Sequence, residues 1–532
     1  MATRRARSRR GRASVDAVTD AARTPTSGQP LPAAAPSSQG VDARGVLALL
    51  DALEAHPLVD PHSLVLVRHG RAVAQGWWAP FSPEQPHLLY SLSKSFTSAA
   101  LGLAVAEGLL SLDDRLVDVL PELADAAAGE RARSVRLRDL AAMSSGHLAE
   151  TWDRAVAADP DEPLRGFLGI EPEREPGTVF AYNQPCTHAV AAAVQRASGQ
   201  TLLEYLRPRL LEPLGVTGLD STGWKQHPAG RDLGFSGLHA TTDAVVKLGL
   251  LHLQRGEWRG RQLLPAAWVD EAVRPHVTTP HEAEVDWRQG YGYQFWTQRH
   301  GYRGDGAYGQ FCVVLPEHDA VLAVTADTPD MQAVLDAVWT HLLPAMTAAP
   351  LDDDARGWDA ELAERMSALA APPAPGGAAP TGAADWDGVL FTPTHLARGG
   401  DAEVRDVRVE RRGETWHLVV REPGGDGAGW VLDAPFAAGR WTTTEVPVGD
   451  GGDGVVPVAL SGGWVGAAGA ESLRVEVRFL QTPHRLVVSA EREALSARAR
   501  WVTAPLHGGS LAGMRSPVPT GPARSATSGG QV

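Results

Sequence analysis

The stretch LLYSLSKSFTSAALGLAVAEGLL, residues 88–110, decides how the first half of the chain is interpreted. Over residues 93–107, apolar side chains fall on nearly every face of a helix, which is typical of a helix buried inside a large domain. Lys94 lies in this segment, where a surface charge is not expected. The sequence therefore predicts a buried lysine with serines on either side of it.

The spacing of the serines favours Ser91 as the partner of Lys94. If the helix extends back by one turn, these two residues share a face, with about 5 to 6 Å between their Cβ atoms. Burial disfavours a charged amine, so the pKa of Lys94 should fall from its usual value of about 10.4. A neutral amine can accept the serine proton, and backbone N–H groups at the helix N-terminus can hold an oxyanion. A lysine whose ammonium group reaches solvent is the alternative.

Length, charge and composition narrow the function classes. The chain has 532 residues, 43% hydrophobic and 21% charged, which suits a globular protein of two or three domains. A net charge of −14 argues against a nucleic-acid partner, although residues 1–12 form an arginine-rich arm, interpreted as a solvated tail. No apolar run has the length of a signal peptide or membrane span, so we expect a cytoplasmic protein.

Metal and disulfide chemistry are not indicated. Cys186 and Cys312 are far apart in sequence and fit reduced packing residues. Metal motifs such as HExxH or paired CxxC are absent from the sequence. We therefore expect no metal and no cofactor.

Composition and periodicity divide the chain into five segments. We expect a disordered leader over residues 1–40, a first domain over 41–346, a linker with a possible short helix over 347–385, a β-rich domain over 386–506 and a disordered tail over 507–532. In the first domain, strand signals at both ends bracket a helical stretch, which predicts an α+β fold with one sheet built from distant segments. In the second, apolar residues alternate with polar ones, which predicts an antiparallel sheet with one wet face.

Several segments together resemble one family. YSLSKSFTSAALGLAVAEGLLSLDDRLVDVLPEL, VRLRDLAAMSSGH and EPGTVFAYNQPCTHAV follow one another in the order found in serine β-lactamase-related hydrolases, the group of class C β-lactamases, penicillin-binding proteins and esterases. The resemblance covers residues 45–345. It implies an antiparallel sheet flanked by helices, with an all-helical lobe over the site. It also implies that Ser91 is the acylated nucleophile and Lys94 its proton acceptor.

The second motif of this family is a tyrosine followed two positions later by asparagine. Here Tyr182 matches the tyrosine and would be the general acid/base, whereas Gln184 stands where the family has asparagine and Asn183 lies between them. Gln184 keeps an amide on a longer stem, so it could still orient Lys94 or the substrate. A phenol has a pKa near 10, so Tyr182 would need a cationic neighbour to act as a base.

The third motif is Lys-Thr-Gly or His-x-Gly on a strand that lines the site. Gly306 matches the glycine without a lysine or histidine two residues before it, and Gly309 and Gln310 reproduce a Gly-x-x-Gly-Gln version found in esterase-like relatives. The resemblance implies an oxyanion hole formed by the backbone N–H groups of Ser91 and Ala307. The missing cation puts β-lactam recognition in doubt. Arg303 is either a substitute for it or a solvated loop arginine.

The resemblance also places Trp152 and Trp287 near the pocket loops, although core packing is the commoner fate of such side chains. It implies a serine hydrolase acting through an acyl-enzyme on a small-molecule or short-peptide substrate. An esterase, D-aminoacyl peptidase or amidase fits better than a true β-lactamase. The alternative is a non-catalytic binding or scaffold protein that keeps the fold, which Gln184 and the large C-terminal domain motivate.

Overall fold

The structure is a computed structural model. It describes residues 30–216, 222–228, 230–380, 383–394, 400–424, 429–448, 454–467, 471–506 and 510–517. The arginine-rich arm predicted over residues 1–12 lies outside the described residues. No helix in the described part of the chain is long and apolar enough to cross a membrane.

A six-stranded antiparallel sheet forms the centre of the first half of the chain, in the order β2-β1-β11-β10-β9-β8. Its strands are β1 (Asp60–Arg68), β2 (Arg71–Trp77), β8 (Trp296–Thr297), β9 (Tyr302–Gly306), β10 (Gln310–Leu315) and β11 (Ala320–Asp327). Strands from both ends of this region therefore lie side by side, as the sequence predicts. Residues 69–70 join β1 to β2, and residues 316–319 join β10 to β11.

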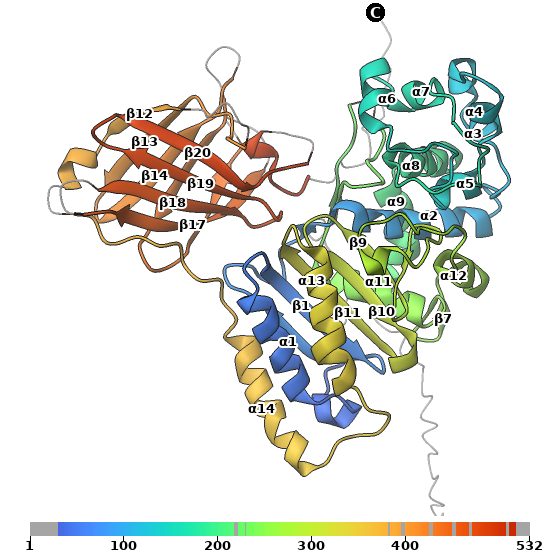
Figure 1. The fold of residues 1–532 in the computed structure, drawn as a ribbon, viewed down its shortest axis with the longest axis horizontal. Coiled ribbons are helices and arrows are strands. Elements are labelled where there is room, and N and C mark those ends of the chain that lie inside the picture. Colours follow the sequence, from blue (N-terminus) through green and yellow to red (C-terminus); the bar gives the residue numbers. More distant parts are fainter. Residues whose placement is uncertain are drawn as a thin grey trace, which may run out of the picture.

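Helices cover both faces of this sheet (Figure 1). On one face, α1 (Ala43–Ala55), α13 (Met331–Ala337) and α14 (Asp353–Ser367) share an apolar core with the strands. On the other, α2 (Ser93–Ala106), α8 (Gln184–Ser198) and α11 (Thr242–Leu253) contribute to a larger core. Because both faces are covered, β10 and β11 are buried at every position.

Shorter elements complete this half of the chain. The helices are α3 (Leu116–Val119), α4 (Glu130–Ser134), α5 (Leu137–Ala141), α6 (Trp152–Ala158), α7 (Pro163–Leu168), α9 (Leu202–Leu206), α10 (Glu212–Leu214) and α12 (Ala266–Val273). Most of them gather in a helical lobe next to α8 (Figure 1). The short strands are β3 (His87–Leu88), β4 (Thr222–Trp224), β5 (Leu238–Ala240), β6 (Glu257–Trp258) and β7 (Arg261–Gln262).

The folded body begins earlier than the expected start near residue 41. Ala33 pairs with Ala72 of β2, and the short helix Pro36–Gln39 packs on α14, where Ser37 donates a hydrogen bond to Asp359. The expectation of a disordered leader is therefore wrong for residues 30–40. Polar and proline-rich composition concealed a segment that is held by contacts with distant residues.

A second sheet of nine strands follows, in the order β15-β14-β13-β12-β20-β19-β18-β17-β16. Its strands are β12 (Val389–Pro393), β13 (Asp406–Arg412), β14 (Thr415–Arg421), β15 (Val431–Phe436), β16 (Thr442–Pro447), β17 (Val455–Val465), β18 (Ser472–Phe479), β19 (Arg485–Glu491) and β20 (Ser496–Thr503). The sheet curls round its own apolar core, so that β15 approaches β16. It is antiparallel except where β12 and β20 pair in parallel, which corrects the expectation of a wholly antiparallel sheet.

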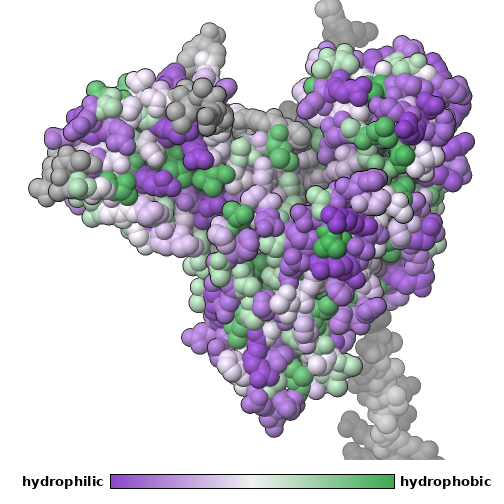
Figure 2. Space-filling view, in the orientation of Figure 1, coloured by the Kyte–Doolittle hydropathy of each residue, from purple (hydrophilic) through white to green (hydrophobic). Residues whose placement is uncertain are grey.

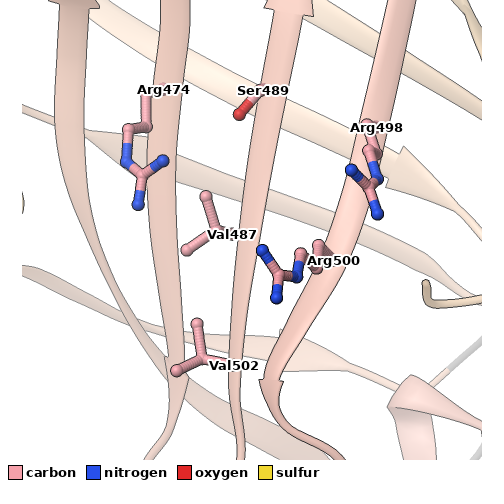
Figure 3. A pocket seen from close by; sticks show the side chains of 6 residues that line it. All are labelled: Arg474, Val487, Ser489, Arg498, Arg500 and Val502. Carbon is pink, nitrogen blue, oxygen red and sulfur yellow. The ribbon is translucent and has the colours of Figure 1, made fainter. Parts of the chain in front are cut away.

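The outer face of this sheet is polar, as the alternating pattern predicts. Arg474 projects from β18, and Arg498 and Arg500 project from β20, around a pocket of about 300 Å³ (Figure 3). The molecular face in Figure 2 is a mosaic of hydrophilic and small hydrophobic areas. The expected end of order near residue 506 is wrong, because Leu511 and Met514 are buried in the C-terminal core.

Candidate active site

Ser91 and Lys94 meet at the start of α2. The 3-10 turn η2 (Tyr90–Leu92) runs directly into this helix, so the two side chains lie on one face. Nζ of Lys94 donates a hydrogen bond of 3.0 Å to Oγ of Ser91. Ser91 is partly exposed, whereas Lys94 is 1% exposed. The nucleophile candidate can therefore meet a substrate while its neighbouring amine is kept from water.

The buried amine of Lys94 is held by two further acceptors. Nζ donates to Oε1 of Gln184 at 2.7 Å and to the carbonyl oxygen of Phe235 at 2.9 Å. Burial lowers the pKa of Lys94 to about 7, although the charges of Asp305 and Glu150 act to raise it. Near neutral pH, a large fraction of this lysine is uncharged and can accept a proton.

Tyr182 lies against the same amine. Nζ of Lys94 is 4.7 Å from the centre of the phenol ring, and the ring stacks on Trp296 at 5.4 Å. The Ser91 side chain acts to lower the pKa of Tyr182, opposite to the effect of burial. Burial raises the pKa of Tyr182 above its usual value, so the phenol stays protonated near neutrality. Its chemistry is that of a proton donor or relay beside the lysine, rather than of a tyrosinate base.

The two amides that follow Tyr182 have different partners. Oδ1 of Asn183 accepts hydrogen bonds of 2.9 Å from both the backbone N–H and the hydroxyl of Thr151. Asn183 is completely buried, and it immediately precedes α8. Gln184, the first residue of that helix, is the amide that contacts Lys94.

Strand β9 and the turn after it form the opposite wall. A Cβ atom on Gly306 would lie 2.0 Å from the carbonyl oxygen of Leu89, and one on Gly304 would lie 2.3 Å from Oγ of Ser95. The strand thus touches the segment that carries Ser91. A side chain at position 304 would require the Ser95 and Leu92 side chains to move, so the packing in this chain favours glycine where the third motif has a cation.

The turn from β9 to β10 carries Ala307. Its next two residues, Tyr308 and Gly309, have positive φ angles of 66° and 87°. The Gln310 amide nitrogen donates hydrogen bonds of 3.1 Å to the carbonyl oxygens of both Ala307 and Tyr308. Gln310 therefore braces the turn that presents the Ala307 N–H group.

Asp305 is a site residue that the sequence analysis missed. It is buried, its pKa is raised by burial, and its charge acts on both Lys94 and Tyr182. Its only sequence signal is a carboxylate between two glycines of a buried strand. Arg303 pairs with it at 2.9 Å and is itself fully buried, so the interpretation of Arg303 as a solvated loop arginine is wrong.

The two tryptophans lie beside the site at different depths. Trp152 packs on Phe235, with ring centres 4.7 Å apart, and Trp287 lies under the guanidinium of Arg303 at 4.1 Å. Neither lines the pocket of about 670 Å³ that opens beside Tyr182. That pocket is formed by residues 148–150, 177–182 and 276–282, of which sequence reasoning selected only Tyr182 as a site residue.

The lining of this pocket is acidic. Glu150 and Glu282 line it together with two histidines, and the described residues that line it include no lysine or arginine. Within the described parts of the chain, no group of three or more His, Cys, Asp or Glu side chains is arranged to hold a metal ion. The pocket of Figure 3, on the C-terminal sheet, contains none of the predicted site residues.

Parts of the chain are similar to known proteins. The 6-aminohexanoate-dimer hydrolase of Paenarthrobacter ureafaciens is 22% identical over 295 residues, 50% of this chain and 73% of that protein. The lovastatin esterase of Penicillium rubens is 28% identical over 169 residues, 28% of this chain and 42% of that protein. The octameric penicillin-binding protein homologue of Pyrococcus abyssi has a TM-score of 0.43 at 16% identity, covering 83% of this chain and 96% of that chain.

The family match spans the segments that carry the site. Residues 62–345 match the Beta-lactamase family, which is more than half of the chain. The match includes Ser91, Lys94, Tyr182 and the β9–β10 turn, and it confirms the expected fold class. The chain belongs to the Beta-lactamase family.

Proposed function

We propose that the protein is a serine hydrolase that cleaves small esters or amides through an acyl-enzyme on Ser91. The observation that carries the proposal is the 3.0 Å contact between Oγ of Ser91 and the buried amine of Lys94. With a pKa near 7, this amine is available as a base at neutral pH. A hydroxyl beside such a base is activated for attack on a carbonyl carbon.

The residues support a complete acyl-transfer cycle. The Ser91 oxygen attacks the substrate carbonyl carbon while its proton passes to Lys94, and the oxyanion accepts hydrogen bonds from the N–H groups of Ser91 and Ala307. As the bond to the leaving oxygen or nitrogen breaks, Tyr182 supplies a proton to that atom and is reprotonated from Lys94. Water then attacks the Ser91 ester, and the same groups return the proton to the serine.

The acidic pocket supports a substrate class. Glu150 and Glu282 repel an anionic substrate, and no cation among the described lining residues offsets them. Arg303 cannot serve as a carboxylate receptor, because its charge is already paired with Asp305. Neutral or amine-bearing esters and amides therefore fit better than a carboxylate-bearing β-lactam. The relatives named as an esterase and a 6-aminohexanoate-dimer hydrolase agree with the cleavage of esters or amides.

The non-catalytic alternative is not favoured. Gln184, the substitution that motivated it, keeps a hydrogen bond to Lys94. Burying a charged lysine costs free energy unless the charge is paired or the amine becomes neutral. A protein that serves only as a scaffold would gain nothing from a buried lysine. The charged neighbours of Lys94 also do not cancel the effect of burial on its pKa.

Intact-protein mass spectrometry after treatment with a fluorophosphonate tests the proposal. We expect one adduct on the native chain and none on Ser91→Ala, followed by hydrolysis of p-nitrophenyl esters and amine-bearing amides in preference to nitrocefin. Ser93→Ala is a matched control, because that hydroxyl accepts a hydrogen bond from the backbone of Leu238 and does not contact Lys94. A native chain that folds correctly and remains unlabelled would contradict the proposal.

A further inference from the structure

Each of the two residues that would form the oxyanion hole has a tyrosine next to it in the sequence. Tyr90 immediately precedes Ser91, and Tyr308 immediately follows Ala307. Their rings meet edge to face, with centres 5.6 Å apart. Both residues have positive φ angles, 48° for Tyr90 and 66° for Tyr308. Residues with a Cβ atom avoid this region, so it persists only where the surroundings hold it.

The C-terminal sheet supplies those surroundings. The hydroxyl of Tyr90 lies 2.8 Å from Nε2 of His484, a buried residue just before β19. The hydroxyl of Tyr308 donates a hydrogen bond of 2.7 Å to the carbonyl oxygen of Ala504, just after β20. The His484 ring also packs edge-on against both tyrosine rings, at 5.8 and 5.9 Å.

The proton on His484 can be assigned from its partners. Nδ1 lies 3.2 Å from the carbonyl oxygen of Thr503, and a carbonyl pairs only with an N–H group. Nδ1 therefore carries the proton, which leaves Nε2 to accept from the Tyr90 hydroxyl. Burial lowers the pKa of His484 to about 3, so the ring keeps this neutral form near neutral pH.

The same surface holds the chain just before the nucleophile. The backbone N–H of Leu88 donates a hydrogen bond of 2.9 Å to the carbonyl oxygen of Gln481, which lies two residues after the end of β18 and three before His484. One turn of the C-terminal sheet thus contacts the segment of Ser91, and the end of β20 contacts the turn of Ala307. The two N–H donors come from distant segments, and the second sheet contacts both.

We propose that His484 is a positioning residue for the oxyanion hole, acting through Tyr90 and Tyr308 without touching the substrate. This inference rests on the proposed function and assigns a catalytic purpose to the C-terminal sheet. Positioning matters most in the transition state, because N–H donors must lie close to the developing oxyanion. Loss of His484 should therefore lower kcat while leaving KM nearly unchanged.

Three full-length variants test it, with kcat and KM measured on a p-nitrophenyl ester and the labelling rate of Ser91 measured with the fluorophosphonate. His484→Phe keeps the ring but loses the acceptor, and we expect kcat to fall roughly 10- to 100-fold. His484→Gln keeps an acceptor and should recover most of that loss. Tyr90→Phe deletes only the hydroxyl and should lower kcat in the same direction, which keeps the test valid if His484→Phe does not fold.

Arg485→Gln is the matched control. It removes ion pairs to Asp60 at 3.2 Å and Asp327 at 2.7 Å in the same interface, without a tyrosine contact. We expect its kcat to stay within about threefold of the native value when both are assayed well below their unfolding temperatures. Equal losses in Arg485→Gln and His484→Phe, or no loss in Tyr90→Phe and His484→Phe, would overturn the inference while labelling of the native chain upholds the proposed function. A native chain that is not labelled would contradict both this inference and the proposed function.

Discussion

Oε1 of Gln184 accepts a hydrogen bond of 2.7 Å from Nζ of Lys94, although the family motif has asparagine at this position. The longer side chain starts from the first residue of α8 and still reaches the lysine. Asn183 cannot take its place, because its amide oxygen is occupied by Thr151. Gln184 therefore keeps an amide in contact with Lys94, and substitutions at position 184 should change the pKa of the lysine.

The native enzyme should gain activity as pH rises through about 7. Lys94 must be neutral to accept the Ser91 proton, and its folded-state pKa is about 7, so the active fraction is lost below that value. The acidic limb of kcat/KM for an uncharged p-nitrophenyl ester measures this directly. A limb near pH 4 to 5, where carboxylates titrate, would contradict the assignment of Lys94 as the base.

Gln184→Glu should move that limb to higher pH. The change places a carboxylate against the amine and favours its charged form, with an expected shift of about 1 to 3 pH units. The matched variant Gln184→Met removes the acceptor without adding charge, and its limb should not move upward. A limb unchanged in Gln184→Glu would show that another group titrates.

Asp305→Asn should move the limb the opposite way. Asp305 raises the pKa of Lys94, so removal of its charge lets that pKa fall and extends activity to lower pH. The variant also leaves the buried guanidinium of Arg303 without its ion-pair partner, which should lower the unfolding temperature. The profile is therefore recorded below that temperature, and an upward shift would refute the electrostatic account.

Tyr182→Phe separates proton relay from packing. The ring should keep its stacking on Trp296, so stability should change by less than about 1 kcal/mol, while kcat should fall roughly 100- to 10,000-fold. Steady-state kinetics and thermal unfolding of the same preparation give both quantities. A stable variant with native kcat would exclude Tyr182 from the proton path.

Gly304→Ala tests the contact between β9 and the nucleophile segment. The new methyl group would lie 2.3 Å from Oγ of Ser95, so we expect a loss of about 1 to 3 kcal/mol in unfolding free energy and a loss of activity. Gly357→Ala in α14 is the control, because its Cβ atom meets nothing within 4 Å. That change should stabilise the helix by up to about 1 kcal/mol, as measured by urea unfolding.

Local patterns predicted those parts of the fold that local contacts determine. The hairpin of β1 and β2, the pair β10 and β11, and the alternation along β18 all follow from strand periodicity and turn residues. Helix α1 escaped notice although Leu49, Leu50 and Leu53 are buried on one side of it. Its proline- and glycine-rich surroundings masked a helical pattern that tertiary packing stabilises.

The contacts of the site also fall into two groups, those that local spacing predicts and those that it does not. The three-residue spacing alone predicts the contact between Ser91 and Lys94, because one turn of helix places these side chains together. Asp305 and the Phe235 carbonyl reach the site from distant segments, as His484 reaches Tyr90, and no local pattern predicts such contacts. A backbone carbonyl leaves no side-chain signature at all, so Phe235 could be identified only from the fold.

The pairing of β1 with β11 also determines when, during synthesis, the active site can form. Val65 lies opposite Ala323, so the central sheet lacks a strand until residues 320–327 have been synthesised. At about 5 to 20 residues per second, translation needs roughly 10 to 50 seconds to pass from the nucleophile to that strand. During this interval Ser91 is an ordinary hydroxyl on a growing chain, and the site can form only after residue 327 has been synthesised.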